Sequence, residues 1–73
     1  MTAKLPTMHE VKSANISKMG AHQGTLYVQF SGGGVYKYPG AGHHLAEAMK
    51  AESVGKYFHT NIKGHYNHAL VDG

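Results

Sequence analysis

The chain has 73 residues and a net charge of +3, with seven lysines against four acidic residues and seven histidines counted as neutral. This length fits one small domain with a modest core. The absence of cysteine excludes disulfides and thiolate metal sites and fits a reducing cytoplasm, and no apolar run is long enough to span a membrane.

Residues 1–10 show no clear hydrophobic period, and Pro6 opposes a helix through this stretch. We therefore predict a flexible N-terminal arm. Two interpretations of the arm remain open: a segment without function, or a segment that orders on a partner with Leu5 and Met8 as apolar anchors. A first strand is expected over residues 13–20, with a bulge to accommodate its irregular apolar spacing.

The clearest signal lies in residues 25–38. Apolar side chains alternate with others over residues 25–30, as in a strand with one buried face. The glycines at positions 32–34 tolerate positive φ, and a run of β-branched and aromatic residues returns over residues 35–38. Because Pro39 offers no donor to the ladder, the pattern predicts an antiparallel hairpin that ends there.

Beyond the hairpin the hydrophobic period becomes helical. An apolar stripe with charged residues facing away predicts a short amphipathic helix over residues 43–51. Ser53 is typical of the N-cap of a second helix and Gly64 of its C-terminal stop, whereas Gly55 disfavours one continuous helix. Residues 67–73 have little core pattern, so we expect a flexible C-terminal tail.

These elements predict an α+β domain over residues 11–66, built as a small three-stranded antiparallel sheet with two short helices packed on one face. A hairpin alone is only marginally stable in water, so the third strand and the helices must cover it. The predicted core consists of Ile16, Leu26, Val28, Phe30, Leu45, Met49, Phe58 and Ile62.

Catalysis finds little support in the sequence. The four acidic residues are scattered, and the glycines at positions 32–34 join two strands, so they lack the helix N-terminus that a phosphate-binding loop needs. The glycine turn itself explains Ser31. The histidines show no tight ligand spacing, so we expect them at the surface, with no metal site and no cofactor. We therefore expect a protein that is not an enzyme.

Tyr36 and Tyr38 occupy one face of the predicted hairpin, with lysines nearby. Exposed tyrosines beside lysines resemble a platform for single-stranded RNA, and the candidate RNA-binding residues are Tyr36, Tyr38, Lys56 and Lys63. The competing interpretation places the tyrosine rings in the core beneath the helices. Arginine is absent, which disfavours base-specific DNA readout, whereas lysine suits phosphates or exposed carboxylates.

Several short motifs occur in order along the chain: Ser13–Ile16, Leu26–Phe30, Val35–Tyr38, Ser53–Phe58 and Asn61–Gly64. Their order and spacing resemble those of the KTSC domain, the small module named after the C-terminus of some lysyl-tRNA synthetases. The sequence resembles this family from Val11 to Tyr66, and its Tyr36 and Tyr38 match the central Tyr-x-Tyr motif. The segment Pro39–Gly42 and the abundant histidines depart from the family pattern. The resemblance implies RNA binding as one function of the domain.

A free-standing KTSC-like chain also resembles small transcription regulators of lytic bacteriophages. That resemblance implies binding to host RNA polymerase, inhibition of transcription initiation and antitermination, all in the host cytoplasm. We expect a monomer with no membrane partner and with nascent RNA as a second partner; single-strand RNA binding of KTSC type is the alternative function. The candidate partner-binding residues are Lys4, Leu5, Met8, His9, Lys12, Lys18 and Lys37.

Overall fold

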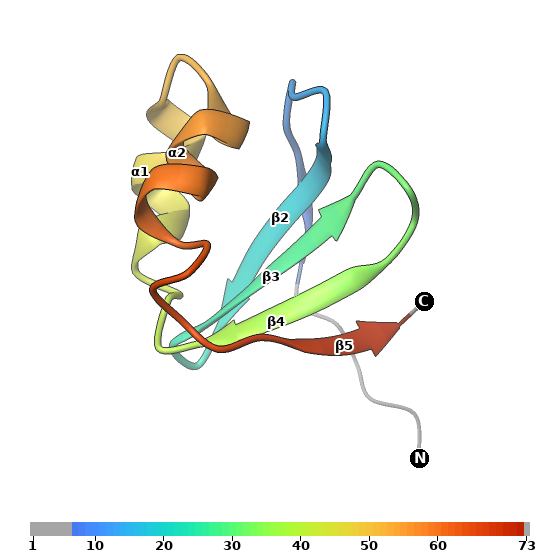
Figure 1. Ribbon diagram of the computed structural model, residues 1–73, viewed down its shortest axis with the longest axis vertical. Helices are drawn as coiled ribbons and strands as arrows, with labels where there is room; N and C mark the ends of the chain where they lie inside the picture. The colour runs from blue at the N-terminus through green and yellow to red at the C-terminus, as the bar shows by residue number, and fades with distance from the viewer. Residues whose placement is uncertain (1–6, 73) are drawn as a thin grey trace.

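Within residues 7–72, five antiparallel strands form one sheet, and each strand pairs with the next one along the chain (Figure 1). Both helices lie on the same side of this sheet. The computed structural model describes residues 7–72. In chain order the elements are β1 His9–Glu10, β2 Ile16–His22, β3 Thr25–Phe30, β4 Val35–Pro39, α1 His44–Lys50, α2 Val54–Asn61 and β5 Ala69–Asp72.

The α+β class is confirmed, but the prediction of three strands was wrong. The two additional strands are β1 and β5, which form the edges of the sheet and come from the segments expected to be arm and tail. β1 has only two residues and β5 only four, so neither is long enough to give a readable alternation. Their pairing with β2 and β4 is a tertiary effect that local pattern does not carry.

The first central strand begins later than predicted. Ser13 turns the chain before it, because its hydroxyl oxygen accepts from the amides of Asn15 at 3.3 Å and Ile16 at 3.4 Å. The expected bulge is present, with a register shift between Ile16 and Lys18. Because of this extra residue, Met19 and not Lys18 shares the buried face of Ile16.

The β3–β4 hairpin is confirmed. Leu26 lies opposite Tyr38 and Val28 opposite Tyr36, so these four side chains point to the helix side of the sheet. The turn closes through the Phe30 amide, which donates to the carbonyl oxygen of Gly34 at 2.9 Å. Both predicted helices are also present.

α1 falls within one residue of its expected bounds at each end. α2 begins where expected because the Ser53 hydroxyl accepts from the Lys56 amide at 3.2 Å. It stops near Gly64, whose φ of 84° favours glycine.

The core lies between the helices and the sheet and differs in part from the prediction. Met49 is 40% exposed, and Phe30 and Leu45 are only half-buried. α1 is short and buries its small residue, Ala48, so the longer side chains flank the contact. The buried cluster consists of Ile16, Met19, Leu26, Val28, Tyr38, Ala41, Ala48, Val54, Phe58 and Ile62.

Candidate functional site

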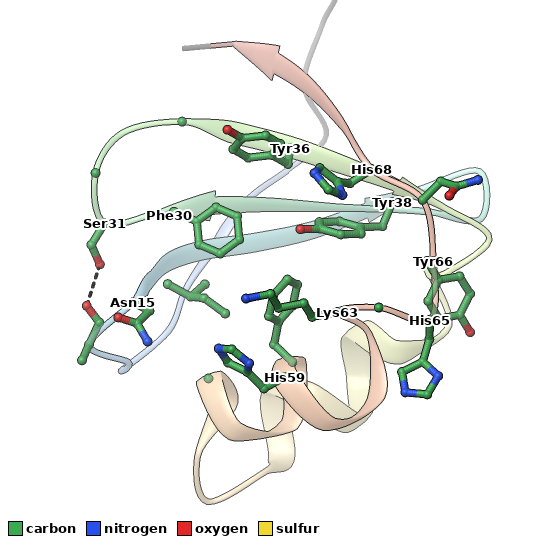
Figure 2. A pocket seen from close by; sticks show the side chains of 18 residues that line it. Asn15, Phe30, Ser31, Tyr36, Tyr38, His59, Lys63, His65, Tyr66 and His68 are labelled. Carbon is green, nitrogen blue, oxygen red and sulfur yellow. Dashed lines mark hydrogen bonds between the residues drawn. The ribbon is translucent and has the colours of Figure 1, made fainter.

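An open groove of about 1310 Å³ runs between the β3–β4 hairpin and one side of α2 (Figure 2). One wall comes from the hairpin and from the turn that precedes β2. The other comes from α2 and from residues 63–68, which connect α2 to β5. The site therefore combines segments that lie far apart in the sequence.

Aromatic side chains form the sheet side of the groove. The rings of Phe30 and Tyr36 meet edge to face, with centroids 5.6 Å apart. His68 reaches across from the connection before β5, and its ring centroid lies 5.6 Å from that of Tyr36 and 5.6 Å from that of Tyr38 (Figure 2). Phe30 and Tyr36 are half-buried and His68 is exposed, so parts of these rings face the open groove.

The side chain of Tyr38 belongs to the core and also lines the groove. It is only 4% exposed, and its ring meets Phe58 edge to face at 5.4 Å. Burial, and to a lesser extent the nearby Tyr36, raises the pKa of the Tyr38 hydroxyl above its ordinary value. Of the two interpretations of the tyrosine pair, the core describes Tyr38 and the groove surface describes Tyr36.

The helix side of the groove supplies positive charge. Lys63 follows α2, and its amide donates to the carbonyl oxygen of Phe58 at 2.9 Å, which fixes where the side chain begins. His59 and His65 line the same side, and all three are exposed. None of the eighteen lining residues is acidic. A ligand in the groove would therefore meet the Lys63 cation and aromatic rings without a carboxylate to repel an anion.

The candidate RNA-binding residues are mostly brought together. Tyr36, Tyr38 and Lys63 line the groove. Lys56 does not, and instead lines a neighbouring hollow of about 470 Å³ together with Lys12 and Glu52. The two hollows share His59, so Lys56 lies near the groove but outside it.

The candidate polymerase-binding residues are spread more widely. Lys4 and Leu5 lie outside the described residues. Lys18 lies opposite Gln29 and Lys37 opposite Tyr27, which places both lysines on the sheet face away from the groove. The remaining three candidates fall on or beside β1: His9 in the strand, Met8 before it and Lys12 after it.

Met8 is held against β2. A Cβ added to Gly20 would lie 2.5 Å from the Thr7 carbonyl oxygen and 2.9 Å from the Met8 sulfur, so the chain before β1 packs directly on the Gly20 backbone. His9 then pairs with Met19, and Glu10 with Lys18. The β1–β2 edge thus gathers Met8, His9 and Lys18.

One cluster was missed by the sequence interpretation. His44 on α1 places its Nδ1 2.8 Å from the Tyr57 hydroxyl and its Nε2 3.0 Å from the Tyr66 hydroxyl. A neutral imidazole donates at one nitrogen and accepts at the other, so both contacts can be satisfied. Burial, followed by the neighbouring His43, lowers the pKa of His44. No spacing in the sequence predicts this cluster, because its members come from three different segments of the chain.

The same cluster positions one wall of the groove. Tyr66 lines the groove and is tied to α1 through His44. On the opposite wall the Ser31 hydroxyl donates to the Ala14 carbonyl oxygen at 3.0 Å, which ties the hairpin tip to the turn before β2 (Figure 2). The hydroxyl of Ser31 therefore makes a structural hydrogen bond at this wall of the groove.

Residues 7–72 contain neither a metal-binding cluster nor a membrane-spanning helix. No three side chains of the His, Asp or Glu type converge there in the manner of a metal-ion site. Neither α1 nor α2 has the length and apolar character required to cross a bilayer.

The comparison with known protein families identifies the domain. A model of the KTSC domain matches residues 12–66, which is more than half of the chain. The matched span contains β2, β3, β4 and both helices, and it leaves the edge strands β1 and β5 outside. No curated protein matches the sequence at a significant level. The chain belongs to the KTSC domain family.

Proposed function

We propose that this chain is a bacteriophage-encoded regulator that binds host bacterial RNA polymerase, inhibits transcription initiation and promotes antitermination. It would act in the host cytoplasm as a monomer and by occupying a surface, with no catalytic step. Its membership of the KTSC family supports the resemblance to phage regulators from which this function is inferred.

The observation that carries the proposal is the composition of the β1–β2 edge. β1 is the outer strand on this side of the described sheet, and His9 and Glu10 are both exposed. An outer strand has backbone donors and acceptors on its free side, and proteins commonly add a partner strand at such an edge. Met8 beside it offers an apolar contact, and Lys18 offers a positive charge opposite Glu10 in the ladder.

The lysine-based charge supports a protein partner at this edge. Lys12 and Lys18 flank β1 in the chain and across the ladder. Lysine presents a compact point charge, which suits steering toward exposed carboxylates on an acidic protein surface. Lys37 lies on the same sheet face as Lys18 but two strands away, so it extends this positive face rather than the edge itself.

A binding assay with purified polymerase from the cognate host tests the proposal. The full chain should bind, and charge reversal by Lys12→Glu with Lys18→Glu should weaken binding at least tenfold, most strongly at low salt because surface charges are then least screened. Lys50→Glu is the matched control, because Lys50 is an exposed lysine on α1 outside this edge. Failure of the full chain to bind polymerase would rule out the proposed function.

Removal of residues 1–10 tests the edge more directly. The truncated chain loses β1 and the Thr7–Met8 contact with Gly20, so its fold must be checked by NMR before binding is compared. Loss of binding by a folded truncated chain is the expected result. Equal binding by both chains would exclude this edge from the interface. The lysines on the sheet face away from the groove would then remain as the candidate contacts.

Single-strand RNA binding is the second candidate function, and the groove is the observation that favours it. Its aromatic and cationic lining lies on the helix side of the sheet, whereas Lys18 and Lys37 lie on the other side. Substitutions on the two faces therefore separate the candidates. A chain that binds RNA and not polymerase would make RNA binding the function.

A further inference from the structure

We propose that the groove between the β3–β4 hairpin and α2 is a binding site for single-stranded nucleic acid, in which a base stacks on Tyr36 and an adjacent phosphate lies near Lys63. This inference deepens the RNA-binding candidate, rests on it, and does not require polymerase binding. It assigns a base-stacking and a phosphate-binding role to opposite walls of one groove.

The stacking role follows from which aromatic rings are exposed in the groove. Tyr38 is nearly buried, so it offers no free ring face, whereas Tyr36 is half-buried and lines the groove. Phe30 and His68 contact Tyr36 through inclined rings, at interplanar angles of 73° and 65°, so neither ring lies parallel to it in a stack. A tyrosine held in this way is a suitable platform for one base of any type.

The phosphate role follows from charge. Lys63 lies on the wall that faces the rings, with the polar side chain of His59 beside it, and no acidic residue lines the groove (Figure 2). Asn15 and Asn67 at the same groove add side-chain amides that can donate to or accept from base edges. Aromatic rings, cations and amides are the three elements with which proteins hold single strands.

The size and openness of the groove favour a polymer over a small molecule. Its volume of about 1310 Å³ exceeds the range of about 300–1,000 Å³ of ordinary small-molecule pockets. The neighbouring hollow, which shares His59 with the groove, contains both Lys56 and Glu52 and therefore adds no net positive charge from this pair. An acidic peptide would also use Lys63, but it would not need the ring of Tyr36.

The groove is also held in shape before a ligand arrives. The Ser31 hydroxyl fixes the hairpin tip to Ala14, and His44 fixes Tyr66 to α1, so both walls have a hydrogen bond that does not involve the ligand. Preorganised walls reduce the conformational entropy lost on binding. The site can therefore bind without a large rearrangement of the domain.

Fluorescence anisotropy with the full chain tests the site. The probe is a labelled oligouridylate of about ten nucleotides, a length within the range that one small domain covers, with oligodeoxythymidylate as a second arm. Tyr36→Ala should weaken binding by about 5- to 150-fold, as measured for loss of one stacked base, whereas Tyr36→Phe should keep it. Tyr27→Ala is the matched control, since Tyr27 is a half-buried tyrosine on the opposite sheet face.

The phosphate role has its own pair of variants. Lys63→Ala should weaken binding and reduce its salt dependence by about one counterion, whereas Lys50→Ala should change neither. Thermal melts establish that each variant is folded. Equal affinity for RNA and DNA supports stacking without sugar recognition, and preference for RNA supports additional contacts to the 2′-hydroxyl.

Three outcomes would overturn the inference in distinguishable ways. An equal loss of affinity in Tyr36→Ala and Tyr27→Ala would rule out the groove as the binding site and would place RNA binding elsewhere on the chain. No binding of either oligonucleotide tighter than about 100 μM at low salt would remove the RNA-binding candidate altogether. Binding of an oligoglutamate peptide, lost in Lys63→Ala and retained in Tyr36→Ala, would make the groove a site for acidic protein segments.

Discussion

The amide of Gly42 donates to the carbonyl oxygen of Gly24 at 3.0 Å, and the two backbones touch with no side chain between them. Gly40 donates to the same oxygen, also at 3.0 Å. This contact joins the β2–β3 turn to the segment that leads into α1, so it sets where the helices begin relative to the sheet. A Cβ on residue 42 would lie 2.7 Å from the carbonyl carbon of Gly24.

Gly42→Ala should therefore lower the free energy of unfolding by about 1–3 kcal/mol, the usual cost of forcing extra atoms into a packed site. Backbone atoms form the obstacle, so no flexible side chain can move away. Urea denaturation measures the change. Gly32→Ala is the matched control, because a Cβ there meets no atom within 4 Å. Coincident midpoints for the two variants would contradict this account of the contact.

Leu26→Ala should cost about 2–5 kcal/mol, since Leu26 is fully buried in the centre of the sheet and its loss leaves a cavity. For a domain this small, that change is a large fraction of the total stability. Leu70→Ala removes the same atoms from a side chain that is 57% exposed, so its effect should be small. Thermal melts of the pair give the comparison, and similar melting temperatures would mean that the core is placed on the wrong face of β3.

Gly20→Ala should release the chain before β1 without unfolding the domain. The new methyl group would meet the Thr7 carbonyl oxygen at 2.5 Å, and only two ladder pairs hold β1 in place. Amide hydrogen exchange at His9 and Glu10 should accelerate while exchange in β3 is unchanged. If β1 contributes to polymerase binding, the same variant weakens that binding. Unchanged exchange in β1 would show that the strand does not depend on this contact.

Acid should destabilise the fold through His44. Its pKa is lowered in the folded state, chiefly by burial, so the unfolded chain takes up the proton first as the pH falls. The stabilising contribution is complete above the ordinary histidine value of about 6.5, declines as the pH drops below it, and is lost once the pH passes the folded-state pKa.

Urea midpoints measured across this interval test the role of His44. His44→Gln should flatten the pH dependence, because glutamine retains hydrogen-bonding capacity toward Tyr57 and Tyr66 without titrating. A slope as steep in the variant as in the natural chain would assign the acid sensitivity to other groups.

Local sequence patterns specify the parts of the fold that could be predicted. The alternation over residues 25–30 and the glycines after it produced the hairpin, and Ser53 marked the start of α2 through a hydrogen bond three residues along. The two edge strands were not predictable, because a two-residue strand is specified by its neighbour and not by its own pattern. The bulge was expected, but its effect of turning Met19 inward was not.

The site was predicted in part. Tyr36 and Lys63 were named from chemistry alone, and the structure places both in one groove. His68 and Phe30 were missed as groove residues because one belonged to an expected tail and the other to an expected core. His44 was missed because its partners become neighbours only through packing of α1, α2 and the segment before β5.

The order of strands has a consequence for how the molecule opens. Every sheet neighbour follows directly in the chain except β4 and β5, which are separated by both helices. That pairing closes the longest loop and should form last. β5 also buries little, with Leu70 largely exposed, so it should be the first strand to detach in the native state. His68 immediately precedes this strand, so transient detachment of β5 would separate His68 from Tyr36 and Tyr38 and widen the groove.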